Sequence, residues 1–251
     1  MDRYKTLVRK SIIMTGLSLV LSAPVIAQDV ILRGNIVSVD GNYDSAGVNN
    51  AGSLNINGNM NVSGPFTNKS GGSVHATMGL NISGSTLTAT NAGTLTAGSY
   101  WSDGHFINSR GAIASLGVIN SSGNVTNTGT LSITQESKVA DFNGSGGTTD
   151  ITITHVDYFT NMKPLLSATG KIRLDSNSKI VINVSEDVLT SSLYDVVIAV
   201  SGDELEFNHS SENHVFDRTH RFITSGSDFM KVENIEMSVY GIRADFIVKR
   251  K

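Results

Sequence analysis

A short phrase recurs through residues 29–149: Asn, one or two small residues, Gly, one or two small residues, and then an apolar residue. It begins at Asn50, Asn68, Asn91, Asn108, Asn120 and Asn127. Asn and Gly tolerate left-handed backbone conformations, so each phrase predicts a tight corner. The first four corners lie 18, 23 and 17 residues apart, near the length of one coil of a parallel β-solenoid. The later intervals of 12 and 7 residues are those expected of two corners within one coil.

Between the corners, apolar residues alternate with Ser, Thr or Asn, as in Leu54/Ile56 and Leu80/Ile82. This period is that of a strand with one buried face. Such short strands bury too little surface alone and must stack. We therefore expect an all-β fold, a short parallel β-helix or β-solenoid. A β-sandwich also fits short alternating strands, whereas the periodic Val, Ile and Leu argue against disorder.

Residues 1–27 have the features of a cleavable bacterial secretory signal peptide. Four basic residues precede an apolar stretch over residues 12–20, and Val25-Ile-Ala27 loosely fits the cleavage rule. We expect cleavage between Ala27 and Gln28. The apolar stretch is shorter than the roughly 20 residues that a spanning helix needs. We therefore expect export across the inner membrane and no transmembrane segment in the mature chain.

Charge and glycine divide the mature chain. Residues 29–149 contain 20 glycines and ten charged residues, whereas residues 150–251 contain four glycines and 26 charged residues. We therefore expect solenoid repeats over 28–149 and a more charged C-terminal β section over 150–251 that continues or caps the solenoid. A mature net charge of about −6 argues against nucleic acid as a partner. The chain has no Cys, which excludes thiolate zinc sites and thiol chemistry.

No catalytic motif stands out, and we expect no enzyme, no cofactor and no metal site. Beyond its start, the regular region offers few acidic residues: Asp40, Asp44, Asp103, Glu136 and Asp141. Asp44 and Asp103 are expected about three coils apart, roughly 14 Å, which is too far for a paired acid and base. His209, His214 and His220 lack a metal-ligand spacing and are interpreted as solvated loop residues. Asp203-Glu204-x-Glu206 is interpreted as a solvated turn.

Tyr100 and Trp101 are the candidate partner contacts. Neighbours on a strand face opposite sides, so we expect one of the two to be exposed. An exposed aromatic residue on a solenoid flank could stack on a sugar or on a partner side chain. The alternative is a bulge or a loop plug over the end of a coil.

Residues 91–95 and 119–131, with Gly170–Ile182 and Tyr194–Gly202, resemble the passenger regions of Gram-negative autotransporters and filamentous-haemagglutinin-like adhesins. The resemblance implies a right-handed parallel β-helix displayed at the cell surface. It departs from the family after Gly202, where 49 residues remain, too few for the translocating barrel. We therefore expect surface display only with a separate exporter, and otherwise a periplasmic location.

The expected function is that of a non-enzymatic adhesin-like or structural surface protein. Its expected partners are a host surface, a polysaccharide or further copies of the chain. Two alternatives stay open: a carbohydrate-active β-helix enzyme, and a β-sandwich subunit of a surface fibre. Three or more acidic and basic side chains converging on one groove would favour the enzyme.

Overall fold

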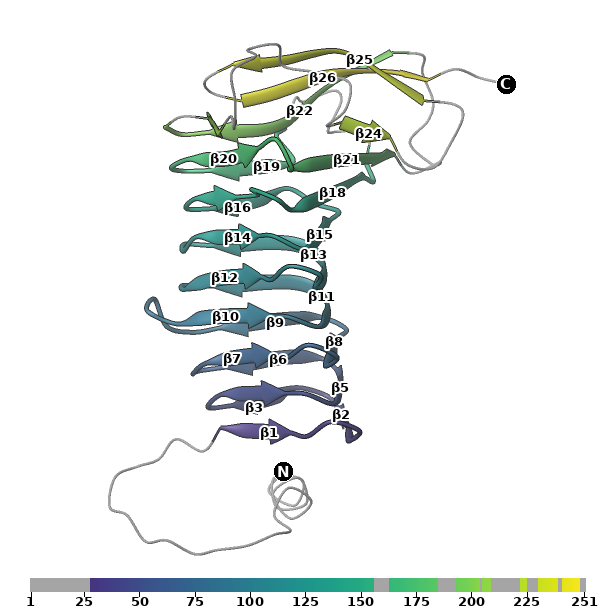
Figure 1. Ribbon diagram of the computed structural model, residues 1–251. Coiled ribbons are helices and arrows are strands. Elements are labelled where there is room, and N and C mark those ends of the chain that lie inside the picture. The colour runs from purple at the N-terminus through teal and green to yellow at the C-terminus, as the bar shows by residue number, and fades with distance from the viewer. Residues whose placement is uncertain are drawn as a thin grey trace, which may run out of the picture.

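The computed structural model describes residues 28–155, 163–184, 193–203, 205–208, 222–224, 230–238 and 241–248. These residues form strands and connecting turns, with no helix among them. The strands lie in parallel tiers that stack into an elongated β-solenoid (Figure 1). The expected solenoid is confirmed. The β-sandwich alternative is wrong, because each strand of the stacked tiers pairs in parallel with a strand about one coil away and not with its neighbour in sequence.

Each coil contributes strands to three faces. Face 1 is a nine-stranded parallel sheet. It contains β1 (Asp29–Ile31), β4 (Val48–Asn50), β7 (Phe66–Asn68), β10 (Thr88–Asn91), β12 (His105–Asn108), β14 (Val125–Asn127), β17 (Phe142–Asn143), β20 (Ile172–Asp175) and β23 (Leu205–Asn208). Its strands therefore repeat once per coil.

Face 2 and face 3 share two long strands, β11 (Thr94–Ser102) and β13 (Ile113–Ser121), which run through both faces. Face 2 also contains β2 (Ile36–Asp40), β5 (Ser53–Asn57), β8 (Ser73–Ala76), β15 (Thr130–Ile133), β18 (Thr148–Ile153), β21 (Lys179–Val184) and β24 (Phe222–Thr224). Face 3 also contains β3 (Tyr43–Ser45), β6 (Asn59–Val62), β9 (Gly79–Ile82), β16 (Ser137–Val139), β19 (Leu166–Ala168) and β22 (Leu193–Ser201).

The parallel stack continues across residue 150, because β18 spans that position and pairs with β15 and β21. The parallel pairing continues to β23 and β24, and beyond them it changes. Strand β26 (Gly241–Val248) is antiparallel to β22 and to β25 (Met230–Ser238). This pair lies across the C-terminal end of the stack (Figure 1). Among the described residues, no helix reaches the length and apolar character that a membrane crossing requires.

The core is built from the alternating apolar residues. On face 2, Leu54 pairs in register with Val74, and Val74 with Leu95, and all three are buried. On face 1, Phe66 and Phe106 fill the interior, and the ring of Phe106 lies 4.9 Å from that of Tyr100. The stacked side chains thus form one continuous apolar column along the solenoid.

A ladder of buried asparagines, defined by Asn50, Asn68, Asn91, Asn108 and Asn127, follows the corner between face 1 and face 2. Each side-chain amide donates to the Oδ1 of the next member at 2.8 to 2.9 Å, and Asn127 donates to the Thr148 carbonyl. Five of the six Asn phrases therefore mark this corner. Asn120 does not, because it lies in β13 on face 3.

The second corner, between face 3 and face 1, is built from Ser and Gly. The Gly104 and Gly123 amides donate to the hydroxyls of Ser102 and Ser121. The Ser121 hydroxyl donates to the Gly104 carbonyl of the preceding coil at 3.0 Å. The backbones approach so closely that a Cβ on Gly123 would lie 2.2 Å from the Gly104 carbonyl oxygen. Glycine is therefore required at this corner for space.

Candidate functional site

A row of outward-facing side chains runs along face 3, one per coil. It consists, in register, of Asp44, Asn61, Asn81, Trp101, Asn120 and Lys138. We call it the face 3 row. The Asn61 amide donates to Asp44 Oδ1 at 2.8 Å, and the Asn81 amide donates to Asn61 Oδ1 at 2.7 Å. Parallel register thus places a polar side chain, or the single Trp, about every 4.8 Å along the flank.

Trp101 is the aromatic member of this row, with 49% of its surface exposed. Tyr100 points inward and is fully buried. The expectation that one of the two is exposed is confirmed. Tyr100 cannot reach a partner, which removes it from the candidate contacts, and burial raises its pKa to about 12. Trp101 lies within a nine-residue strand rather than in a loop plug over a coil end.

Two shallow hollows lie beside the face 3 row, toward the Ser/Gly corner. One is lined by Asn81, Ile82, Ser83, Trp101, Ser102, Asp103, Asn120 and Ser122. The other is lined by Asp44, Ser45, Ala46, Asn61, Val62, Ser63 and Ser83. Because both include Ser83, they adjoin and follow the solenoid axis over five coils. We call them together the Trp101 trough.

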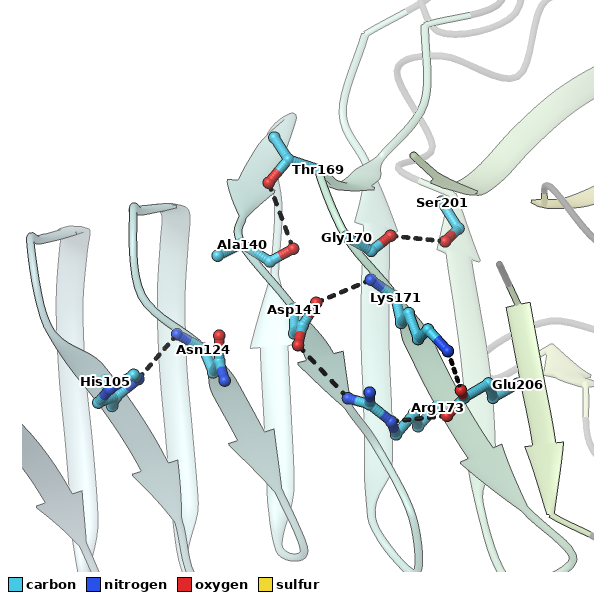
Figure 2. Close-up of polar contacts among 10 residues, drawn as sticks. All are labelled: His105, Asn124, Ala140, Asp141, Thr169, Gly170, Lys171, Arg173, Ser201 and Glu206. Atoms are coloured by element: carbon cyan, nitrogen blue, oxygen red, sulfur yellow. Dashed lines mark hydrogen bonds and ion pairs between the residues drawn. The ribbon is translucent and has the colours of Figure 1, made fainter. Parts of the chain in front are cut away.

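A cluster of charged side chains lies on face 1 near the C-terminal end of the stack (Figure 2). Asp141 accepts the Lys171 backbone amide at 2.8 Å and lies 3.5 Å from an Arg173 guanidinium nitrogen. Glu206 accepts Arg173 Nε at 2.7 Å and pairs with the Lys171 ammonium. The four side chains come from three successive coils. We call this set the face 1 charge cluster.

Two pKa shifts in the cluster, those of Glu206 and Arg173, both favour the ionised state. The hydrogen bond from Lys171 is the main cause that lowers the pKa of Glu206; desolvation opposes it and Arg173 adds to it. Desolvation also acts against the charge of Arg173, but Glu206 and Asp141 outweigh it and raise the pKa of Arg173. A general acid needs a raised carboxyl pKa to hold its proton near neutral pH. Glu206 is shifted in the opposite direction.

The other acidic residues are dispersed along the stack. Asp44 and Asp103 are separated by three coils, because Asp44 pairs through Asn61 and Asn81 to Trp101, two residues before Asp103. Glu136 forms an ion pair with Lys138 at 3.2 Å. Asp40 accepts the Asn57 amide at 3.0 Å. Asp141 alone among these five joins other charged residues in a cluster.

The described histidines belong to neither the face 3 row nor the face 1 charge cluster. His75, His105 and His155 are exposed, and His105 Nδ1 accepts a hydrogen bond from the backbone N–H of Asn124 at 3.0 Å. His209, His214, His220, Glu204 and Ala27 lie outside the described residues, as does the proposed signal peptide, and Gln28 is the first residue described. Glu206 is not in a turn: it belongs to β23, which corrects that interpretation. Within the described ranges, no group of three or more His, Cys, Asp or Glu could hold a metal ion.

The sequence interpretation missed the buried role of the Asn ladder and the whole face 1 charge cluster. The ladder had a usable signal, because the Asn phrases were already aligned at coil-length intervals. The sequence signal for the face 1 charge cluster was weaker. Its interacting residues lie 30 to 35 positions apart, whereas successive members of the Asn ladder lie 17 to 23 positions apart. Only the coil alignment brings Asp141, Arg173 and Glu206 together.

No protein-family model matches the chain, no curated protein matches it, and no solved structure matches it. The functional interpretation therefore depends on the solenoid's own surfaces. The face 3 row, the Trp101 trough and the face 1 charge cluster are the sites that the described residues offer.

Proposed function

We propose that this chain is an exported, non-enzymatic surface protein, adhesin-like or structural, of the type that autotransporter passengers represent. The observation that carries the proposal is the face 3 row. Side chains from successive coils stand in register there, so one rigid flank presents a repeated pattern along the solenoid axis. An extended partner can use such a flank over many coils.

The physical advantage of a repeated flank is multivalency. Each contact with one side chain of the face 3 row is weak, but contacts on one rigid stack act at high effective concentration once the first has formed. The backbone is already ordered by pairing on both sides, so binding would cost little conformational entropy. These properties suit attachment or assembly, in which many weak contacts are made together.

Localisation tests the proposal most directly. The full chain with a C-terminal epitope tag is followed in the producing cells by fractionation and by protease treatment of intact cells. We expect the tag to be lost from intact cells while a periplasmic marker protein stays whole. A matched chain without residues 1–27 should stay in the cytoplasm and resist the protease. Recovery of the full chain only from the shielded periplasm would overturn surface display.

The face 1 charge cluster favours a second candidate, a carbohydrate-active β-helix enzyme. It brings two acidic and two basic side chains together on one face, although neither hollow of the Trp101 trough includes them. Each carboxylate also accepts hydrogen bonds from its neighbours, which opposes proton transfer. The test is release of reducing ends or of unsaturated products from a polysaccharide panel. Activity that Glu206→Gln and Asp141→Asn both abolish, with an unchanged melting temperature, would establish the enzyme.

A further inference from the structure

We propose that the Trp101 trough binds a neutral oligosaccharide, laid along the solenoid axis with one sugar ring stacked on Trp101. This inference rests on the proposed function, since it names the class of partner that the flank would take. It depends on three features: an exposed aromatic ring, hydrogen-bonding groups on both sides of it, and the charge of the lining.

The aromatic ring is held in a rigid setting. Trp101 pairs with Asn81 of β9 on one side and with Asn120 of β13 on the other. The residues that flank it in sequence, Tyr100 and Ser102, are both buried, which anchors the strand. With 49% of its surface exposed, the indole offers a flat apolar platform whose backbone does not need to be ordered on binding.

Hydrogen-bonding groups lie directly beside this platform. The Asn120 side chain forms no hydrogen bond to another described residue, and it lines the trough half-buried. Asn81 donates one amide hydrogen to Asn61. Its Oδ1 has no donor among the described residues. Ser83, Ser122 and Asp103 add hydroxyl and carboxylate groups. A sugar matches this combination, because one ring face presents C–H groups and its rim presents hydroxyls.

The charge of the lining selects among sugars. The trough contains two carboxylates, Asp44 and Asp103, and neither of its hollows is lined by Lys or Arg. Carboxylates accept hydrogen bonds from sugar hydroxyls but repel sulfate, phosphate and uronate groups. The lining therefore favours an uncharged chain over an anionic polysaccharide. The two adjoining hollows extend along five coils, so an oligosaccharide of several units fits better than a single sugar.

The experiment uses the intrinsic fluorescence of the protein, because Trp101 is the only tryptophan in the chain. The purified exported protein is titrated with neutral oligosaccharides of glucose, of mannose and of N-acetylglucosamine, and the emission maximum is recorded. We expect at least one of them to shift the emission to shorter wavelength in a saturable manner. Calorimetry then measures the same affinity without relying on the fluorophore.

Variants assign the binding to the trough. Trp101→Ala should weaken binding about tenfold or more in calorimetry. This is the loss expected when an aromatic side chain that the bound partner covers is removed. Trp101→Phe should restore part of it. The matched control is Ile113→Ala, since Ile113 is also 49% exposed but lies on face 2, away from the trough. Ile113→Ala should bind as the parent does, and all three variants should keep the parent's circular dichroism spectrum.

Three outcomes would overturn the inference. The first is the absence of a shift with every neutral oligosaccharide at millimolar concentration. The second is equal binding by the parent and Trp101→Ala. The third is a preference for dextran sulfate or for a basic peptide over all neutral sugars. Localisation is a separate readout. Surface display without sugar binding would contradict only this inference, and sugar binding by a periplasmic protein would contradict only the proposed surface display.

Discussion

Asn68 and Asn91 face each other inside the solenoid, one coil apart, and the Asn68 amide donates to Asn91 Oδ1 at 2.8 Å. The second amide hydrogen of Asn68 reaches the Thr94 carbonyl of that same next coil at 2.9 Å. Neither asparagine has any exposed surface. Water therefore cannot replace either bond if its partner is removed.

Asn91→Ala should lower the free energy of unfolding by about 2–4 kcal/mol, because at least two buried polar groups lose their partners at about 1–3 kcal/mol each. The matched control is Asn57→Ala. Asn57 also bonds one coil away, to Asp40, but it is exposed, and its loss should cost less than about 0.5 kcal/mol. Urea titration of both variants makes the comparison, and equal costs would contradict the ladder's role.

Gly93→Ala should destabilise the chain by about 3 kcal/mol or more, since the new Cβ would lie 2.1 Å from the Gly72 carbonyl oxygen of the preceding coil. Gly146→Ala separates space from backbone strain. Gly146 has a φ of +72° but no atom near its would-be Cβ, so its replacement should cost only about 1 kcal/mol. Melting curves that ranked the two variants in the reverse order would refute the close-approach argument.

Phe106→Ala should cost about 3–5 kcal/mol, because it removes a fully buried ring from the column and leaves a cavity. Its contact with Tyr100, at 4.9 Å between ring centres, is lost as well. Ile113→Ala serves as the surface control and should cost less than about 1 kcal/mol. Chemical denaturation tests both, and a small effect at Phe106 would argue against the packed interior.

Asp150 and Asp175 should shape the acid stability in opposite senses. Burial raises the pKa of Asp150, against a hydrogen bond from Asn183. Burial also acts to raise the pKa of Asp175, but the amides of Gly146 and Asn177 and the Ser178 hydroxyl outweigh it and lower that pKa. The stabilising contribution of Asp175 is thus present above its unfolded pKa and is lost as the pH falls through the folded value. That of Asp150 is present below its unfolded pKa and is lost as the pH rises through the folded one.

Melting temperatures between about pH 6 and about pH 3 test this pair. Relative to the parent, Asp175→Asn should lose less stability on acidification. Asp150→Asn should lose more, because the parent regains stability there when Asp150 is protonated. Parallel pH profiles for the parent and both variants would show that neither carboxyl differs between the folded and unfolded states.

Sequence periodicity predicted the parts of the fold that depend on local pattern. The alternation at Leu54 and Ile56 correctly placed both side chains inside. The Asn intervals identified coil length, because the ladder joins residues 18, 23 and 17 positions apart. Asn120 illustrates the limit. Its phrase has the same letters, but Gly123 belongs to the Ser/Gly corner, so the short later intervals do reflect two corners of one coil.

The candidate site was predictable only at Trp101. Strand alternation separated Trp101 from Tyr100 and left one of them exposed. Its neighbours in the trough, Asn81 and Asn120, are adjacent only through interstrand register, which a local pattern does not contain. The face 1 charge cluster is harder still. The coils that contain it are longer. Arg173 therefore pairs with Glu206, which lies 33 residues later in the sequence, and no sequence repeat has this interval.

The Asn ladder also gives the stack a direction. Both amide hydrogens of Asn50, Asn68, Asn91 and Asn108 are directed to the following coil, to the next asparagine and to a backbone carbonyl. The shortest bonds of each amide therefore form only when the C-terminal neighbour is in place, although Asn50 and Asn68 also reach the Gly52 and Gly72 carbonyls of their own coil at 3.3 and 3.4 Å. A coil lost from the N-terminal end leaves a ladder oxygen without its side-chain donor, and it also leaves backbone amides unpaired, such as that of Ser73, which donates to the Gly52 carbonyl of the preceding coil. The ladder is thus polar along the solenoid axis: its amide groups point toward the C-terminal end of the stack and its side-chain oxygens toward the N-terminal end.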